Sequence, residues 1–148
     1  MHRGLSIEGM TADTVVDYIG AKRLYDPPRL LTDAEMRRKL QQTLNPKRYA
    51  HVLGVEETAR AMARRFGEDE NKAALAGLLH DCAKCMPLSQ MLKAARREQV
   101  DDVMRESKAL MHALAGRCVA EDIYNVHDED VLGAIRWHTT GRAGMTRL

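Results

Sequence analysis

Apolar side chains recur at intervals of three and four residues along most of this chain. That spacing is the period of an α-helix, and no stretch shows the strict alternation of a half-buried strand. Residues that favour helix N-caps precede the apolar runs, and Thr32 with Glu35 three residues later has the pattern of a capping box. The sequence therefore predicts an all-α fold, a helical bundle preceded by a separable helix that starts near Thr11. Further N-caps are expected at Asn45, Asp69, Ser89, Ser107 and Asp128.

The apolar positions also indicate which helices form the core. Residues 73–79 are apolar on every side, so this helix is predicted to be surrounded by others. The last helix places Ile135 and His138 on one face and is followed by a loop over residues 139–144. The helix before Gly67 is expected to turn one stripe inward, formed by Val52, Val55, Ala59, Met62 and Phe66.

Length and composition limit the class of protein. The chain has 148 residues, 45% hydrophobic and 30% charged, which suits one soluble domain. A net charge of +2 provides no strongly basic surface for nucleic acid, and no apolar run approaches the ~20 residues of a membrane span. No signal peptide is visible, and the three cysteines are an odd number. We therefore expect a cytoplasmic protein with reduced thiols, with neither nucleic acid nor a membrane as partner.

Histidines on separate helices are the first indication of chemistry. His51, His80, His112 and His138 fall on four different predicted helices, each on or beside the apolar face. One inward histidine is usually a core or boundary residue, but a bundle can bring four of them to a common centre, where metal sites are built. Asp81 directly follows His80, and a buried carboxylate needs a charged or metal partner. The pattern indicates a metal centre.

Three sequence segments carry a family resemblance: Arg48-Tyr49-Ala50-His51, the stretch 76–84 (AGLLHDCAK), and 135–142 (IRWHTTGR). They resemble the HD domains, metal-dependent phosphohydrolases named for the His-Asp doublet. Among these, they are most similar to the bacterial symmetrical bis(5′-nucleosyl)-tetraphosphatases. The similarity runs from about Leu31 to the C-terminus.

The resemblance implies a centre of two divalent or mixed-valence metal ions, usually iron, bridged by Asp81 and by a water or hydroxide. His51 and His80 would bind one metal, and His112 and His138 the other. Imidazole and carboxylate ligands suit several transition metals, so ligand type alone does not choose among them. The implied reaction is cleavage of diadenosine tetraphosphate to two ADP by attack of the bridging hydroxide.

The same resemblance assigns cations to the substrate. Lys84, three residues after Asp81, would act in catalysis and bind a phosphate, and Arg142 in the loop after the last helix is a second phosphate-binding candidate. Further substrate-binding candidates are Arg48, Thr139 and Thr140.

The chain also departs from the family pattern. HD domains of this type carry one more aspartate on a helix after the His138 motif, whereas no acidic residue follows Asp130 here. The expectation is an HD domain over residues 31–148 that lacks its final helix, with one metal short of a ligand. Residues 1–30 form an N-terminal extension. Segments 4–11 and 15–19 in it are similar to the tail of nicotinate-nucleotide adenylyltransferases, and a simple amphipathic extension is the alternative.

Two other functions remain open from sequence alone. One is a different HD phosphohydrolase, acting on a nucleoside monophosphate or another small phosphate ester. The other is a truncated, catalytically poor domain that binds nucleotide or packs against a partner. In that case apolar residues around Ile135 and Trp137 would be uncovered and would favour a homodimer.

Overall fold

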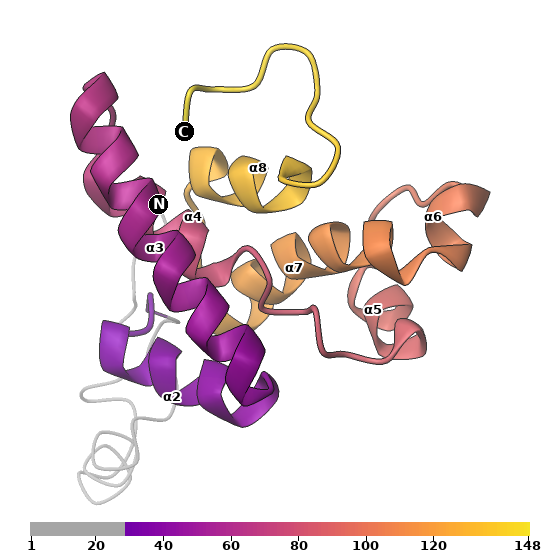
Figure 1. Cartoon of the computed structure of the whole chain (residues 1–148). Helices are drawn as coiled ribbons and strands as arrows, with labels where there is room; N and C mark the ends of the chain where they lie inside the picture. The colour runs from indigo at the N-terminus through magenta and orange to yellow at the C-terminus, as the bar shows by residue number, and fades with distance from the viewer. Residues whose placement is uncertain (1–28) are drawn as a thin grey trace, which may run out of the picture.

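The computed structural model describes residues 29–148, which form helices without any β-strand (Figure 1). The all-α prediction is therefore confirmed, while the helix predicted from Thr11 lies outside the described residues. The elements are α2 (Asp33–Thr43), α3 (Pro46–Phe66), α4 (Glu70–Leu79), α5 (Leu88–Ala94), α6 (Asp102–Glu106), α7 (Lys108–Tyr124) and α8 (Glu129–Trp137).

Most helices begin where side chains can accept the free N–H groups of the first turn. Thr32 forms the predicted capping box with Glu35. Four further predicted caps are confirmed by side-chain oxygens that accept backbone N–H groups, at Asn45, Asp69, Ser107 and Asp128. Gly67 ends α3 in the left-handed conformation, with φ 74°.

The cap predicted at Ser89 is wrong. The N-cap residue is Pro87, two residues earlier, and α5 begins at Leu88; the φ of Pro87, −60°, already suits a helix start. Ser89 therefore lies inside the first turn. The short helix α6 was not predicted; Asp101 caps it by accepting a hydrogen bond from the Met104 N–H.

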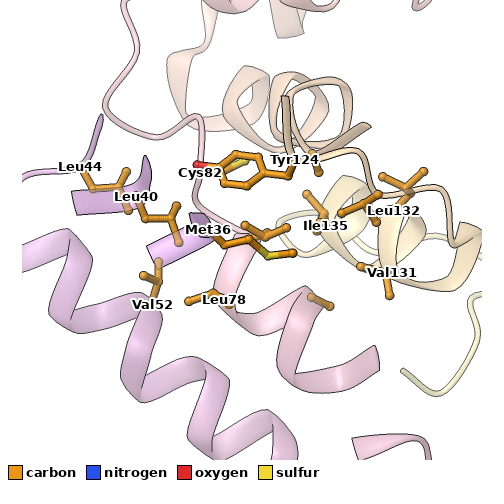
Figure 2. Packing of buried hydrophobic residues seen from close by; sticks show 14 residues of the cluster. Met36, Leu40, Leu44, Val52, Leu78, Cys82, Tyr124, Val131, Leu132 and Ile135 are labelled. Atoms are coloured by element: carbon orange, nitrogen blue, oxygen red, sulfur yellow. The ribbon is translucent and has the colours of Figure 1, made fainter. Parts of the chain in front are cut away.

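The main core surrounds α4, as the apolar run 73–79 predicted. Figure 1 shows α4 between α3 and α8, and it contacts both helices. Side chains from α2, α3, α4 and α8 meet there, including Leu40, Val52, Leu78 and Ile135, and all four are buried (Figure 2). Ile135 is fully buried, so the prediction that it lies on an uncovered surface is wrong.

A second, smaller core lies between α5 and α7, where Met91 packs with Met111 and Leu114. The turn after α4 joins the two cores, because Cys82 belongs to the first and the next residue, Ala83, to the second. Burial raises the pKa of the Cys82 thiol to about 12, which marks it as an unreactive core residue. The segment that follows α4 is thus fixed from two sides.

The inward stripe predicted for α3 is only partly buried. Met62 and Phe66 are each 54% exposed, so their assignment to the core is wrong. The reason is orientation around the helix axis: α4 runs antiparallel beside the second half of α3, with Gly77 against Val55 and Ala59, and it buries Ala63. Met62 and Phe66 lie on a flank of α3 that faces a groove and that the described residues leave open. These side chains line an open apolar groove of about 440 Å³ that reaches His80 and His138.

No helix within residues 29–148 is long and apolar enough to cross a membrane.

Candidate metal centre

His80 and His138 occupy equivalent positions at the ends of two helices. They are the C-cap residues of α4 and α8. His80 was predicted inside a longer helix, which is wrong, whereas the end of α8 at His138 agrees with the loop predicted from residue 139. His80 Nδ1 lies 2.7 Å from the Gly77 carbonyl and His138 Nδ1 lies 2.8 Å from the Ile135 carbonyl. Each ring thus forms a hydrogen bond with the backbone carbonyl that would accept the N–H of the next residue if the helix continued. This competition accounts for the end of each helix.

The other two histidines lie within helices, as predicted. His51 is on α3, one helix away from His80, and the two Nε2 atoms are 3.3 Å apart. His112 is on α7, 1% exposed, and its Nε2 lies 3.0 Å from His138 Nε2. The fold therefore brings the four histidines together in two pairs.

Asp81 lies between the two pairs and presents one oxygen to each. Its Oδ2 is 3.4 Å from His80 Nε2 and 3.8 Å from His51 Nε2. Its Oδ1 is 3.1 Å from His112 Nε2 and 3.8 Å from His138 Nε2. The donor atoms of each group, two imidazoles and Asp81, lie within 4.8 Å of one another. This is the division of donors that the family resemblance implied.

The charge states of these side chains suit a cation. A carbonyl can only accept, so His80 and His138 donate from Nδ1, and their Nε2 lone pairs face Asp81 when the rings are neutral. Burial lowers the pKa of His138, and burial together with the neighbouring His80 lowers the pKa of His51, which keeps both rings neutral. Burial opposes ionisation of Asp81, but when His112 and His80 carry a proton on the nitrogen that faces the carboxylate, their hydrogen bonds outweigh burial and hold the pKa of Asp81 below its ordinary value. A metal ion would take the place of those protons.

Two of the predicted cations reach this centre. The Arg48 guanidinium donates to Asp81 Oδ2 at 2.8 Å, so it contacts the proposed bridging carboxylate itself. Lys84 is half-buried, and its Nζ lies 3.1 Å from His112 Nε2 and 3.3 Å from Nδ1. A primary ammonium group thus stands at the edge of the centre, where it can meet an anion.

The remaining candidates are not brought to the centre. Thr139 and Thr140 are exposed in the turn after His138, and within residues 29–148 their side chains make no hydrogen bond. Arg142 lies near the ring of Trp137, with its Cζ 5.6 Å from the ring centroid. Sequence reasoning missed Arg136, whose Cζ lies 4.1 Å from the same centroid. An arginine next to a tryptophan in sequence was the only available signal.

The donor set fits transition metals. Each group offers two imidazole nitrogens and one carboxylate oxygen, a combination that suits Fe, Mn, Co or Zn. The hydrogen bonds from Nδ1 of His80 and His138 to backbone carbonyls are the kind of support that orients ligating histidines. The residues present can therefore hold two metal ions that share Asp81.

The geometry defines a class of protein: an all-helical domain with a histidine–aspartate cluster suited to a pair of metal ions. The chain belongs to the HD-domain family, because the family described as "HD domain" matches residues 48–146. That match includes the His80-Asp81 doublet and all four clustered histidines.

Similar proteins refine this placement. The chain is 41% identical over 110 residues to the "Bis(5'-nucleosyl)-tetraphosphatase, symmetrical" of Bacillus subtilis, covering 74% of this chain and 59% of that protein. A Staphylococcus aureus protein with the same description is 37% identical, with 75% and 58% covered. The chain thus spans less than two thirds of the length of these relatives.

Two further matches concern the fold and the N-terminal segment. A Clostridium acetobutylicum protein, described as a predicted HD superfamily hydrolase involved in NAD metabolism, has a solved structure that matches with a TM-score of 0.77 and 38% identity. That match covers 80% of this chain and 64% of the other. A Mycoplasma genitalium protein, described as "Probable nicotinate-nucleotide adenylyltransferase/Ap4A hydrolase", is 28% identical over 134 residues, which are 90% of this chain and 35% of that protein.

Proposed function

We propose that this protein hydrolyses symmetrical dinucleoside tetraphosphates, with diadenosine tetraphosphate giving two ADP. The observation that carries the proposal is the position of Asp81, with one carboxylate oxygen toward His51 and His80 and the other toward His112 and His138. The relatives described as symmetrical tetraphosphatases, at 37% to 41% identity, support this substrate class.

In this proposal His51, His80 and Asp81 hold one metal ion, and Asp81, His112 and His138 hold a second. When bound, such ions supply Lewis acidity, which withdraws charge from a phosphate and acidifies water. The proposed metal is iron, as in the proteins that the sequence resembles. Elemental analysis of the purified protein decides the metal, because the donors suit several.

Other residues of the chain hold and neutralise the substrate. Lys84 is proposed to donate to a phosphate oxygen that gains charge in the transition state, since its Nζ lies at the edge of the centre. Arg48 positions the carboxylate of Asp81 through the 2.8 Å contact. The exposed hydroxyls of Thr139 and Thr140 are proposed to hydrogen-bond the phosphate chain as it leaves the centre.

The reaction consumes one water molecule. Its oxygen bonds to one of the two middle phosphorus atoms, the bridging P–O bond breaks, and the oxygen of that bond leaves with the other phosphate. Two ADP result, and the two hydrogens of the water are released as protons when both new terminal phosphates are fully ionised. Symmetry of the substrate around that bond makes ADP the sole product, which separates this activity from that of another HD phosphohydrolase.

The test is to assay diadenosine tetraphosphate with protein of known metal content. We expect about two metals per chain, ADP as sole product, loss of turnover after a chelator and its return when Fe²⁺ or Mn²⁺ is added back. Products other than ADP would point to the different phosphohydrolase. A metal-free protein without turnover would support the catalytically poor domain.

Lys84→Ala is expected to lower kcat about a hundredfold while leaving two metals bound, because Lys84 contacts His112 but offers no ligand atom. Lys84→Arg should recover part of the rate, since it keeps the charge. Lys93→Ala on the exposed side of α5 is the matched control and should leave kcat unchanged. Unaltered kcat in Lys84→Ala would remove this residue from the mechanism.

The organisation of the chain is also proposed, as an HD domain over residues 31–148 after an N-terminal extension over 1–30. The match to the Mycoplasma protein covers more of this chain than residues 29–148 can supply, so it includes part of the extension. This supports the likeness of that segment to an adenylyltransferase tail. The cytoplasmic location stays a prediction.

The homodimer stays a prediction as well, but its expected surface moves to the apolar groove beside Met62 and Phe66. Light scattering of the chain, which has a mass of 16.7 kDa, is expected to give twice that value, because a second copy would cover these side chains. Phe66→Glu should return the chain to a monomer, whereas Val103→Glu, at an apolar residue on α6 that is more exposed than Phe66 but lies outside the groove, should not. A monomeric parent chain would contradict the prediction.

A further inference from the structure

A second cavity, of about 660 Å³, lies between α8, the loop that follows it and the segment after α5. Figure 1 shows this loop, in yellow, arching over α8. None of the five proposed metal donors lines the cavity, whereas Arg136, Trp137 and Arg142 all do. We call these three residues the arginine–tryptophan cluster.

Two guanidinium groups lie within cation–π distance of the indole ring of Trp137. The Cζ of Arg136 lies 4.1 Å from the ring centroid and that of Arg142 lies 5.6 Å away. Both are within the range of a cation–π contact, which orients the cations on the ring but leaves their N–H groups free for an acceptor. The cluster thus offers an aromatic surface and a double set of planar donors in one place.

The acidic residues of the cavity already have other partners. Glu98 and Glu129 contact Arg117 at 2.9 and 3.4 Å, and Asp130 contacts Lys72 at 2.9 Å. Within residues 29–148, the guanidinium groups of Arg136 and Arg142 make no hydrogen bond and no ion pair. Arg136 is also half-buried, and a partly desolvated cation without a carboxylate favours an anionic ligand.

We propose that the arginine–tryptophan cluster binds a nucleotide, with its phosphate oxygens on Arg136 and Arg142 and its base against Trp137. Planar guanidinium groups match phosphate oxygens in pairs, and a base stacks on an indole without needing a particular sequence of donors. The nucleotide is either the second half of the dinucleoside substrate, in which case the inference rests on the proposed function, or a separate nucleotide.

The course of the chain favours the second half of the substrate. Residues 138–142 lead directly from the metal donor His138 to Arg142, through the exposed hydroxyls of Thr139 and Thr140. A tetraphosphate that begins at the metal centre can therefore follow this turn to the cluster. Only the first of its two nucleotides then needs the metal centre.

The test uses Trp137, which is the only tryptophan of the chain. In the presence of a chelator, ADP is expected to quench its fluorescence saturably, and adenosine or tripolyphosphate should bind at least tenfold more weakly than ADP. Arg136→Ala and Arg142→Ala should each raise the Kd for ADP about tenfold or more. Arg97→Ala is the matched control, because Arg97 lines the same cavity but is paired with Asp122 at 2.8 Å. The Kd of this variant for ADP should equal that of the parent protein.

Arg136→Lys controls for loss of ADP binding through misfolding, since lysine keeps the charge and an alkyl chain but lacks the planar guanidinium donors. It should melt like the parent and still bind ADP more weakly. Absence of saturable quenching, or equal affinity in the parent and all arginine variants, would overturn the proposal whether or not the protein hydrolyses diadenosine tetraphosphate. Quenching by ADP in a protein without any hydrolase activity would uphold the nucleotide site and reject the proposed function.

Kinetics then distinguishes the two sources of the nucleotide. If the cluster holds the second half of the substrate, Arg136→Ala should raise KM for diadenosine tetraphosphate about tenfold and leave KM for adenosine 5′-tetraphosphate, which has one nucleoside, unchanged. If it holds a separate nucleotide, neither KM moves although ADP binding is lost. Both results support the nucleotide site and assign its source.

Discussion

Replacing Asp81 with Asn is expected to remove both metal ions and to lower turnover by more than about a hundredfold. The reason is that Asp81 alone belongs to both groups of donors, through separate carboxylate oxygens. Changes around metal ligands typically cost ~10 to 100-fold in affinity or activity, and removal of a shared carboxylate ligand should cost at least as much. Metal analysis and hydrolysis of diadenosine tetraphosphate on the same samples measure the two effects.

The variant is chosen to preserve the fold. Asn has the shape of Asp, and its amide oxygen can still accept the hydrogen bond from Arg48, so the melting temperature should stay close to that of the parent. Asp122→Asn, at an exposed residue paired with Arg97, is the control for loss of one carboxylate and should keep both metals. Two bound metals in Asp81→Asn would show that the carboxylate does not join the groups.

His51→Ala provides a graded comparison. This side chain is 45% exposed and belongs only to the first group, so its loss should leave the donors Asp81, His112 and His138 intact. We expect about one metal per chain and little change in stability. A variant that loses both metals would indicate that the two sites bind cooperatively and not through separate donor sets.

The parts of this structure that could be predicted depend on neighbours in sequence. Capping by Thr32 and Asp69 is a contact over two or three residues, so the local sequence was enough to predict it. The meeting of the four histidines could be predicted because each lies on or beside an apolar face, and apolar faces of a bundle meet. Their division into two pairs came from the family resemblance. Family resemblance then supplied the role of Asp81 as the residue between them.

The errors concern contacts that depend on distant parts of the chain. Met62 and Phe66 continue the apolar period of α3, but the sequence does not reveal that α4 packs on one flank of α3 and leaves these two side chains on an open groove. In the same way, no period predicts that the imidazoles of His80 and His138 take a backbone carbonyl and end their helices. The arginine–tryptophan cluster was missed because its cavity forms only when the loop folds over α8.

Gly77→Ala is expected to destabilise the fold by about 1–3 kcal/mol. α3 and α4 come so close here that an added Cβ would lie 3.0 Å from the Cα of Glu56, 3.1 Å from the Val55 carbonyl oxygen and 3.2 Å from the Cβ of Ala59. Two of these neighbours are backbone atoms, so relief requires the helices to separate. Gly54→Ala is the matched control, because its Cβ meets nothing within 4 Å and alanine gains up to ~1 kcal/mol in a helix.

The same substitution should act on the metal centre, since α3 carries His51 and α4 ends at His80. Their Nε2 atoms are 3.3 Å apart, and a shift of α3 away from α4 would widen that distance. Metal bound by His51, His80 and Asp81 should therefore weaken more than metal bound by Asp81, His112 and His138, which lie on α7 and on the ends of α4 and α8. Denaturant unfolding and metal titration of both glycine variants measure the two consequences. Unaltered stability in Gly77→Ala would mean that α3 and α4 accommodate the added methyl group without loss of free energy. The metal held by His51, His80 and Asp81 should then be retained as well.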